Sequence, residues 1–99
     1  MKYTVHLSPA AVRYFKKIRD KELSLAFRTA LLTLAESPHL GSPKRGDLSG
    51  IYGYDVWHKG TNYEIAYKVY ESGDRQLVVI LAGTRENFHE QLKRHVRHK

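Results

Sequence analysis

Hydrophobic and polar positions alternate with two different periods along the chain, and each period predicts one type of secondary structure. Near the start, Tyr3, Val5 and Leu7 alternate with polar residues, which is typical of a strand with one buried face. Ser8 and Pro9 follow at once. Serine accepts hydrogen bonds from the free N–H groups of a first helical turn, and proline fits that turn because it has no N–H to satisfy. The pattern therefore predicts a first strand and then a helix that begins at Pro9.

Two helices are predicted in succession. The first carries apolar residues three apart, at Val12, Phe15 and Ile18. The second covers residues 22–36, where apolar side chains share one face: Leu23, Phe27, Ala30, Leu31 and Leu34. Pro38 ends the second helix, because the residue before a proline is pushed out of helical conformation. The stretch 39–50, which is rich in glycine, is predicted to be a loop.

From residue 51 onward the hydrophobic period changes to two, which predicts strands over 51–58 and 63–69 joined by a turn. After a second turn, Leu77–Leu81 is continuously apolar. Such a run is typical of a strand that is buried on both faces, so we expect it to lie centrally in the sheet.

A closing helix is predicted after this strand. Its apolar stripe consists of Phe88, Leu92 and Val96, with Asn87 as the cap, and we expect so thin a stripe to dock marginally. The element order is then β-α-α-β-β-β-α. Two early helices must cover one face of a sheet whose last three strands form an antiparallel meander. The chain is thus predicted to be a single α+β domain over residues 1–99.

The charge balance of the chain predicts the kind of partner that it binds. Seventeen Lys and Arg against ten Asp and Glu give a formal net charge of +7 on 99 residues. A surplus of this size predicts a polyanion or an acidic protein as partner. Positive charges gather on the first helix and again over Lys93–Lys99. Such runs serve equally as solvated faces and as contacts to nucleic acid. Aromatic residues on neighbouring strands, among them Trp57, are able to stack bases, whereas we expect Tyr63 and Tyr67 in the core.

Several chemistries are excluded or disfavoured. The chain has no cysteine, so it has no disulfide, no thiolate metal site and no cysteine nucleophile. His95 and His98 lack a third ligand at metal-binding spacing, and no glycine-rich phosphate loop precedes a helix, so we expect neither a metal nor a cofactor. The first residues do not resemble a signal peptide, and the apolar run Leu77–Ala82 is too short to span a bilayer. We therefore expect a cytoplasmic protein with no membrane partner.

Arg85 differs from the other cations because it stands just beyond a buried strand. Its backbone is held by the core, so its side chain could meet a phosphate at a small ordering cost. The competing interpretation is a salt bridge to Glu64 or Asp55 across the sheet. The sequence leaves both interpretations open.

Three segments, together with the order of the elements, resemble the RelE/ParE superfamily of toxins from type II toxin–antitoxin pairs. Ser37-Pro38 is followed by a loop that ends in Lys44–Gly50, similar to the basic loop of the family that ends in Leu-Ser-Gly. Residues 63–69 resemble the family's strand with two tyrosines, and residues 77–85 resemble its last strand, which ends in Gly-x-Arg. The resemblance covers nearly the whole chain.

The resemblance implies two alternative activities. RelE-like members cut mRNA on the ribosome, and the reaction is an attack of a ribose 2′-OH on its own 3′-phosphate. ParE-like members instead inhibit DNA gyrase and need no catalytic residues. Arg85 matches the family's arginine at the end of the last strand, and Arg45, beside Lys44, falls at the basic position before Leu-Ser-Gly. However, Glu64 stands where RelE-like nucleases carry a phosphate-binding arginine, and His89 lies in the stretch where a tyrosine would follow.

These matches and departures lead to a specific set of expectations. We expect a toxin that acts as a metal-independent, ribosome-dependent mRNA endonuclease, with a cognate antitoxin and mRNA on the ribosome as partners. The alternatives are a gyrase inhibitor without catalytic activity and a non-toxic basic module that binds RNA or protein. The expected catalytic residues are Arg85, His89, Glu64 and His58. The expected RNA-binding residues are Lys44, Arg45, Lys59, Lys93, Arg94 and Arg97.

Overall fold

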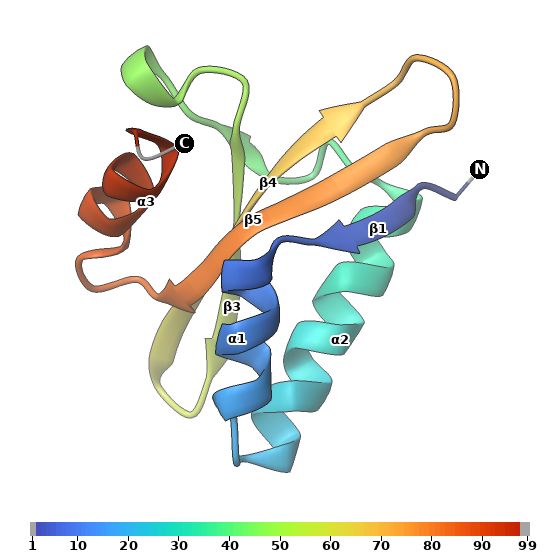
Figure 1. The fold of residues 1–99 in the computed structure, drawn as a ribbon. Helices are drawn as coiled ribbons and strands as arrows, with labels where there is room; N and C mark the ends of the chain where they lie inside the picture. Colours follow the sequence, from blue (N-terminus) through green and yellow to red (C-terminus); the bar gives the residue numbers. More distant parts are fainter. Residues whose placement is uncertain (1, 98–99) are drawn as a thin grey trace.

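The computed structural model describes residues 2–97, and its elements follow the predicted order (Figure 1). The helices are α1 (Pro9–Lys17), α2 (Lys21–Glu36) and α3 (Phe88–Arg97). The strands are β1 (Thr4–Leu7), β2 (Ser42–Pro43), β3 (Tyr52–His58), β4 (Thr61–Tyr70) and β5 (Gln76–Thr84). The short β2 and the 3₁₀ turn η1 (Gly46–Leu48) were not predicted, and both lie within the predicted loop. None of these helices is long and apolar enough to cross a membrane.

The five strands form one mixed sheet in the order β1-β5-β4-β3-β2. β1 runs parallel to β5, and the other neighbours are antiparallel, so the predicted meander is confirmed. The apolar strand β5 lies between β1 and β4, as its composition predicted. The pairing shifts where Ala66 faces Leu81 but Tyr67 faces Val79, which leaves Ile80 as an extra residue. This bulge turns Ile80 and Leu81 to the same face and explains part of the unbroken apolar run.

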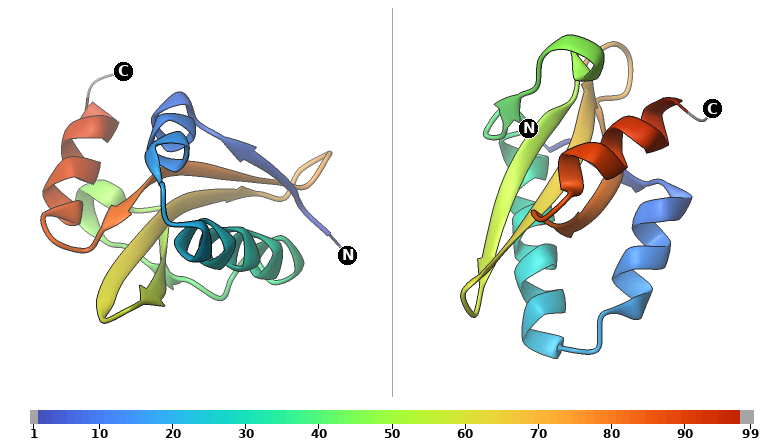
Figure 2. Two further views of the ribbon diagram at one scale, coloured as in Figure 1. Left: turned by 90° about the horizontal axis from the view of Figure 1, so that it is seen from below. Right: turned by 90° about the vertical axis from the view of Figure 1, so that its left-hand side faces the viewer.

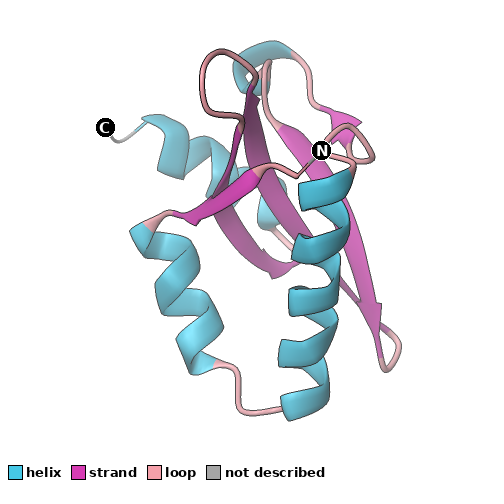
Figure 3. Ribbon diagram, turned by 90° about the vertical axis from the view of Figure 1, so that its right-hand side faces the viewer, coloured by secondary structure: helices cyan, strands magenta, loops and turns pink. Residues whose placement is uncertain are grey.

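The helices α1 and α2 form an antiparallel pair (Figure 3) and pack on one face of the sheet. Their apolar side chains enclose the main core with Ile65, Tyr67 and Val79 of the sheet. The predicted cap of α1 is present, since Ser8 Oγ accepts a hydrogen bond from the Ala11 N–H at 3.1 Å. Helix α2 has a cap that was not predicted, Asp20, whose Oδ1 accepts from the first turn. The main core therefore follows the helical stripes read from the sequence.

The helix α3 stands apart from α1 and α2 (Figure 2) and packs on the other face of the sheet. Phe88 and Leu92 are 1% and 0% exposed, and they form a second cluster with Leu48, Ile51 and Ala66. The expectation of a marginally docked helix is corrected here, because the bulge and the η1 turn supply apolar partners that the stripe did not reveal. Asn87 directly precedes the helix and has a left-handed backbone at a φ of 60°, and its capping role stays a prediction.

The loop after α2 is held in place by a buried tyrosine. The Tyr67 hydroxyl donates to the Pro38 carbonyl at 2.8 Å and accepts from the Gly41 N–H at 3.0 Å. A side chain at position 41 would approach this hydroxyl to 2.5 Å, so the close contact requires glycine. The Lys44 N–H then donates to the Ile51 carbonyl at 2.8 Å. These bonds bring the basic loop to the edge of β3.

Candidate functional site

Charged side chains from four segments meet on the sheet face that carries α3. Glu64 lies two residues before Ala66 on β4, so both point to this face, and Asp55 lies directly across from Glu64 on β3. Lys44 arrives from the loop after β2. Arg85 follows β5, and its N–H donates to the Asn62 carbonyl at 2.8 Å, which continues the sheet by one residue. We call Lys44, Asp55, Glu64 and Arg85 the charged cluster.

The members of the charged cluster are linked by direct ion pairs. Lys44 Nζ lies 2.7 Å from Glu64 Oε2, and Arg85 Nε lies 3.4 Å from Glu64 Oε1. Arg85 Nη1 donates to Asp55 Oδ1 at 3.0 Å. The cluster holds two cations and two carboxylates, so its formal charges balance. The predicted salt bridge is therefore present, because Arg85 bridges Glu64 and Asp55. Arg85 also stands at the end of the last strand, the position from which a phosphate contact was predicted.

Glu64 is the buried member, with a side chain that is 5% exposed. A buried carboxylate is tolerated only where cations and donors compensate its charge, and Lys44 and Arg85 do so on its two oxygens. Space for the carboxylate comes from Gly53 on β3, because a Cβ at that position would overlap Glu64 Oε2. Sequence reasoning missed this role of Gly53, although a glycine inside a strand pattern is a signal of close approach.

The charged cluster lines an open groove of about 370 Å³. The other walls are formed by residues 40–43 and 53–54. The groove is therefore open enough to admit a ligand group to Lys44, Glu64 and Arg85, which sequence reasoning had singled out and which the fold brings together.

The other expected catalytic residues do not join the cluster. His58 lies two residues after Val56, so it points to the face covered by α1 and α2, and its Nε2 lies 3.1 Å from Asp20 Oδ2. This hydrogen bond is the main cause of a lowered pKa of the Asp20 carboxyl. Lys59 Nζ lies 3.3 Å from Glu22 Oε1, and this contact raises the pKa of Lys59. These two residues fasten the β3–β4 hairpin to the start of α2.

The same contacts define the place among residues 2–97 where a metal ion could be held. The side chains of Asp20, Glu22 and His58 each offer a ligand atom, and these atoms lie within 4.8 Å of one another. The Lys59 ammonium already contacts both carboxylates, at 3.6 Å from Asp20 Oδ2 and 3.3 Å from Glu22 Oε1, and offsets one of their two charges. The arrangement lies on the opposite face of the sheet from the charged cluster, so it supplies nothing to the groove.

The remaining expected residues lie around α3 and η1. His89 and Arg94 are exposed on α3, Lys93 is half-buried, and Arg45 is exposed at the start of η1. Arg97 Nη2 lies 3.8 Å from Asp47 Oδ2. His98 and Lys99 belong to the predicted basic tail but lie outside the described residues.

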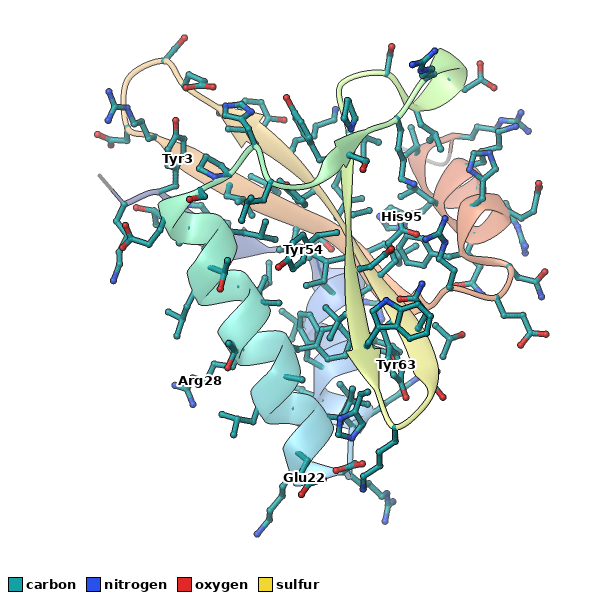
Figure 4. The ribbon with its side chains drawn as sticks, turned by 180° about the vertical axis from the view of Figure 1, so that it is seen from behind. Tyr3, Glu22, Arg28, Tyr54, Tyr63 and His95 are labelled. Carbon is teal, nitrogen blue, oxygen red and sulfur yellow. The ribbon has the colours of Figure 1, made fainter. Side chains whose placement is uncertain are left out.

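Some aromatic residues lie in the core and others on the surface, and Tyr63 and Tyr67 contribute to the core as predicted. Tyr67 is fully buried, and Tyr54 and Tyr63, labelled in Figure 4, pack against the helix-side core. Trp57 is 68% exposed and lies two residues beyond Asp55 on β3, on the same face as the charged cluster. Asn62, its partner across the β3–β4 hairpin, has a buried side-chain oxygen without a hydrogen-bond donor.

The fold and the sequence of this chain were compared with those of known proteins. The chain shares its fold with a doubly substituted E. coli toxin RelE in the free state, with a TM-score of 0.76, 18% identity and full coverage of both chains. The RelBE2 toxin–antitoxin complex of Mycobacterium tuberculosis matches with a TM-score of 0.68 and 24% identity over 86% of this chain and 100% of that one. The intact E. coli RelBE complex matches with a TM-score of 0.67 and 20% identity, over 82% of this chain and 94% of that one.

These structures confirm the predicted α+β fold and its element order. No curated protein sequence shows a significant match. A family model described as the ParE-like toxin of type II bacterial toxin–antitoxin systems matches residues 5–93. Since that match spans most of the chain, this protein belongs to the ParE-like toxins, within the RelE/ParE superfamily of type II toxin–antitoxin systems.

Proposed function

We propose that this toxin is a metal-independent endoribonuclease that cleaves mRNA on the ribosome, and that a cognate antitoxin neutralises it in the cytoplasm. The observation that supports the proposal is Glu64, a buried carboxylate held between Lys44 and Arg85 at the wall of an open groove. Cleavage of RNA without a metal needs a base for the 2′-OH and cations around the phosphate. The charged cluster contains both kinds of group.

The proposed reaction is an internal attack by the ribose. The 2′-oxygen forms a bond to the adjacent phosphorus, the bond from phosphorus to the 5′-oxygen breaks, and a 2′,3′-cyclic phosphate results. Lys44 moves from Glu64 Oε2 to the phosphate as Oε2 takes the proton of the 2′-OH, so Glu64 becomes neutral and no buried charge is left uncompensated. Arg85 stays on Oε1 and faces the phosphate with its terminal nitrogens. Cations placed in advance stabilise the charge that develops in the transition state.

The leaving 5′-oxygen needs a proton, and His89 is the group that we assign to this step. It lies in the first turn of α3, four residues after Arg85, and it is exposed. His58 is left out because it lies on the other face of the sheet. Arg45, Lys93 and Arg94 are assigned to the RNA backbone beyond the groove. The antitoxin partner is supported by the neighbours, since two of them are toxin–antitoxin complexes.

A second candidate is a gyrase inhibitor that binds its target without chemistry. Two observations favour it: the formal charges of the charged cluster balance, and the matching family is described as ParE-like. In this alternative Arg85 and its carboxylates are a structural network at a protein interface.

Controlled expression separates the two candidates. We expect induction of the native chain to arrest translation and to produce mRNA ends that primer extension maps on ribosome-bound messages. Glu64→Gln should abolish the cleavage, while Asp47→Asn, which also removes one acidic charge but lies outside the groove, should retain it. Loss of gyrase supercoiling with intact mRNA would instead establish the second candidate. Growth arrest with neither effect would contradict both.

The salt dependence of RNA binding tests the proposed basic surface. The logarithm of affinity should fall with the logarithm of salt concentration by about 0.7 for each phosphate neutralised on a single strand. Charge reversal at Lys93, Arg94 and Arg97 should flatten this dependence. An unchanged slope would move the RNA contact to the loop that carries Lys44 and Arg45.

A further inference from the structure

The two carboxylates that hold Arg85 differ in how firmly they are held. Glu64 is 5% exposed, and Lys44 binds its second oxygen at 2.7 Å, so it stays in place if the arginine moves. Asp55 is 45% exposed, and Arg85 is the cation that contacts it. One partner of Arg85 is therefore fixed in the sheet, and the other is a solvated side chain on the surface.

The resting charged cluster has no net attraction for an anion. Two cations face two carboxylates, so a phosphodiester that enters the groove meets a neutral group. The guanidinium is exposed, but a phosphate that takes two parallel hydrogen bonds from it competes with the carboxylates that already hold Nε and Nη1. Displacing Glu64 would leave a buried charge with fewer partners, which is costly. Displacing Asp55 leaves a carboxylate that water solvates, and exposed ion pairs of this kind are weak.

The geometry of the arginine fork makes this exchange specific. Arg85 uses Nε for Glu64 and Nη1 for Asp55. When Asp55 leaves, Nε stays on Glu64 and keeps the plane of the guanidinium in position. The terminal nitrogens are then free for two parallel hydrogen bonds to a phosphate, the arrangement that guanidinium groups favour.

We propose that Asp55 is a displaceable latch on Arg85, whose place is taken by a phosphodiester group of single-stranded RNA. The inference rests on the proposed function in that the groove receives an RNA phosphate, but it does not depend on cleavage. It makes Asp55 a residue that lowers the RNA affinity of the resting toxin. Removing its charge strengthens binding, although it also removes an ion pair of the folded protein.

The test measures binding apart from chemistry. A short, fluorescently labelled single-stranded RNA with 2′-O-methyl sugars has no free 2′-OH and cannot undergo the internal attack, so its anisotropy reports affinity alone. The purified toxin is compared with Asp55→Asn and with Asp47→Asn at about 0.15 M salt, where charges more than roughly 8 Å apart are screened. Asp47→Asn is the matched control because it makes the same charge change outside the groove. Its contact with Arg97 is long, at 3.8 Å, and exposed on both sides, so losing that contact should alter RNA binding little.

Exposed ion pairs change an equilibrium by up to about fivefold, and loss of a like charge beside the phosphate adds to this. We therefore expect Asp55→Asn to bind roughly three to ten times more tightly than the native chain, and Asp47→Asn to stay within about twofold. In an Arg85→Ala background the gain from Asp55→Asn should fall to within about twofold, because only the loss of a like charge near the phosphate remains. A general change in charge or stability would leave the gain unchanged. Quenching of Trp57, the single tryptophan of the chain, gives a second readout beside Asp55.

An affinity of Asp55→Asn equal to that of Asp47→Asn would overturn the latch, as would a gain that is equally large without Arg85. The proposed function fails in a different way: tighter binding by Asp55→Asn together with uncut mRNA on ribosomes would support the latch and remove the nuclease. A response of Trp57 to a protein partner and none to RNA would place a protein on this face and also overturn the inference.

Discussion

Shortening Phe88 to alanine is expected to destabilise the whole domain, because α3 closes a second core. The side chain is 1% exposed and packs with Leu92 of the same helix and with Leu48, Ile51 and Ala66 beneath it. Replacing a buried phenylalanine with alanine costs about 3–5 kcal/mol, since burial is lost and a cavity remains. A domain of this size has roughly 5–15 kcal/mol of total stability.

The expected change is large enough to measure without ambiguity. One kcal/mol shifts the melting temperature of a domain of up to about 100 residues by roughly 4–8 °C, so Phe88→Ala should lower it by at least about 12 °C. Leu92→Ala should cost about 2–5 kcal/mol, and the two losses should not add because the side chains share one cluster. Thermal and urea unfolding followed by circular dichroism measure both variants.

His95→Ala is the matched control, because His95 is exposed on the same helix. It should melt within about 4 °C of the native chain, since surface substitutions change stability by about 0.5 kcal/mol or less. A chain that ends before Glu86 should lose its cooperative transition, because the apolar face of the bulge and η1 would be open to water. If Phe88→Ala melts like the control, or the truncated chain unfolds cooperatively, α3 is docked marginally and the argument from burial is wrong.

Three further predictions concern the site and the elements that support it. Arg85→Ala should reduce RNA cleavage by about 10²–10³-fold, measured on ribosome-bound mRNA, and lysine there should rescue weakly because it lacks the fork. It should also cost about 1–3 kcal/mol of stability, because the buried Glu64 carboxylate loses one of its two cations while Lys44 remains. Gly41→Ala should lower stability by about 1–3 kcal/mol in urea unfolding, because its Cβ would press on the Tyr67 hydroxyl; an unchanged midpoint would show that the loop can move. The hydrogen bond from His58 holds the pKa of Asp20 below its ordinary 3.8. The stability that Asp20 contributes is therefore present above about pH 4 and is lost as the pH falls below 3.8 and through the lowered pKa. Acid unfolding of the native chain and Asp20→Ala should therefore converge at low pH, and curves that stay parallel would contradict this assignment.

The local elements of this protein follow directly from its sequence. Period-two alternation marks β3 and β4, helical spacing marks the buried face of α2, and Ser8 marks the start of α1. These features depend on residues within a few positions of one another, so they can be predicted without knowledge of the fold. Side-chain alternation also assigns each residue to a face of its strand. Arg85 could be recognised in this way as a cation fixed at the end of a buried strand.

Tertiary structure alone decided which of these residues meet. Glu64 becomes a buried carboxylate because Gly53 on the next strand leaves space for it and Lys44 arrives from a loop that Tyr67 holds. Each contact depends on strand order and register, which join residues far apart in the chain. His58 alternates with the same regularity as its neighbours, yet register and packing place it on Asp20, across the sheet from Arg85. Ion pairing and burial are properties of two or more segments together, and no single segment encodes them.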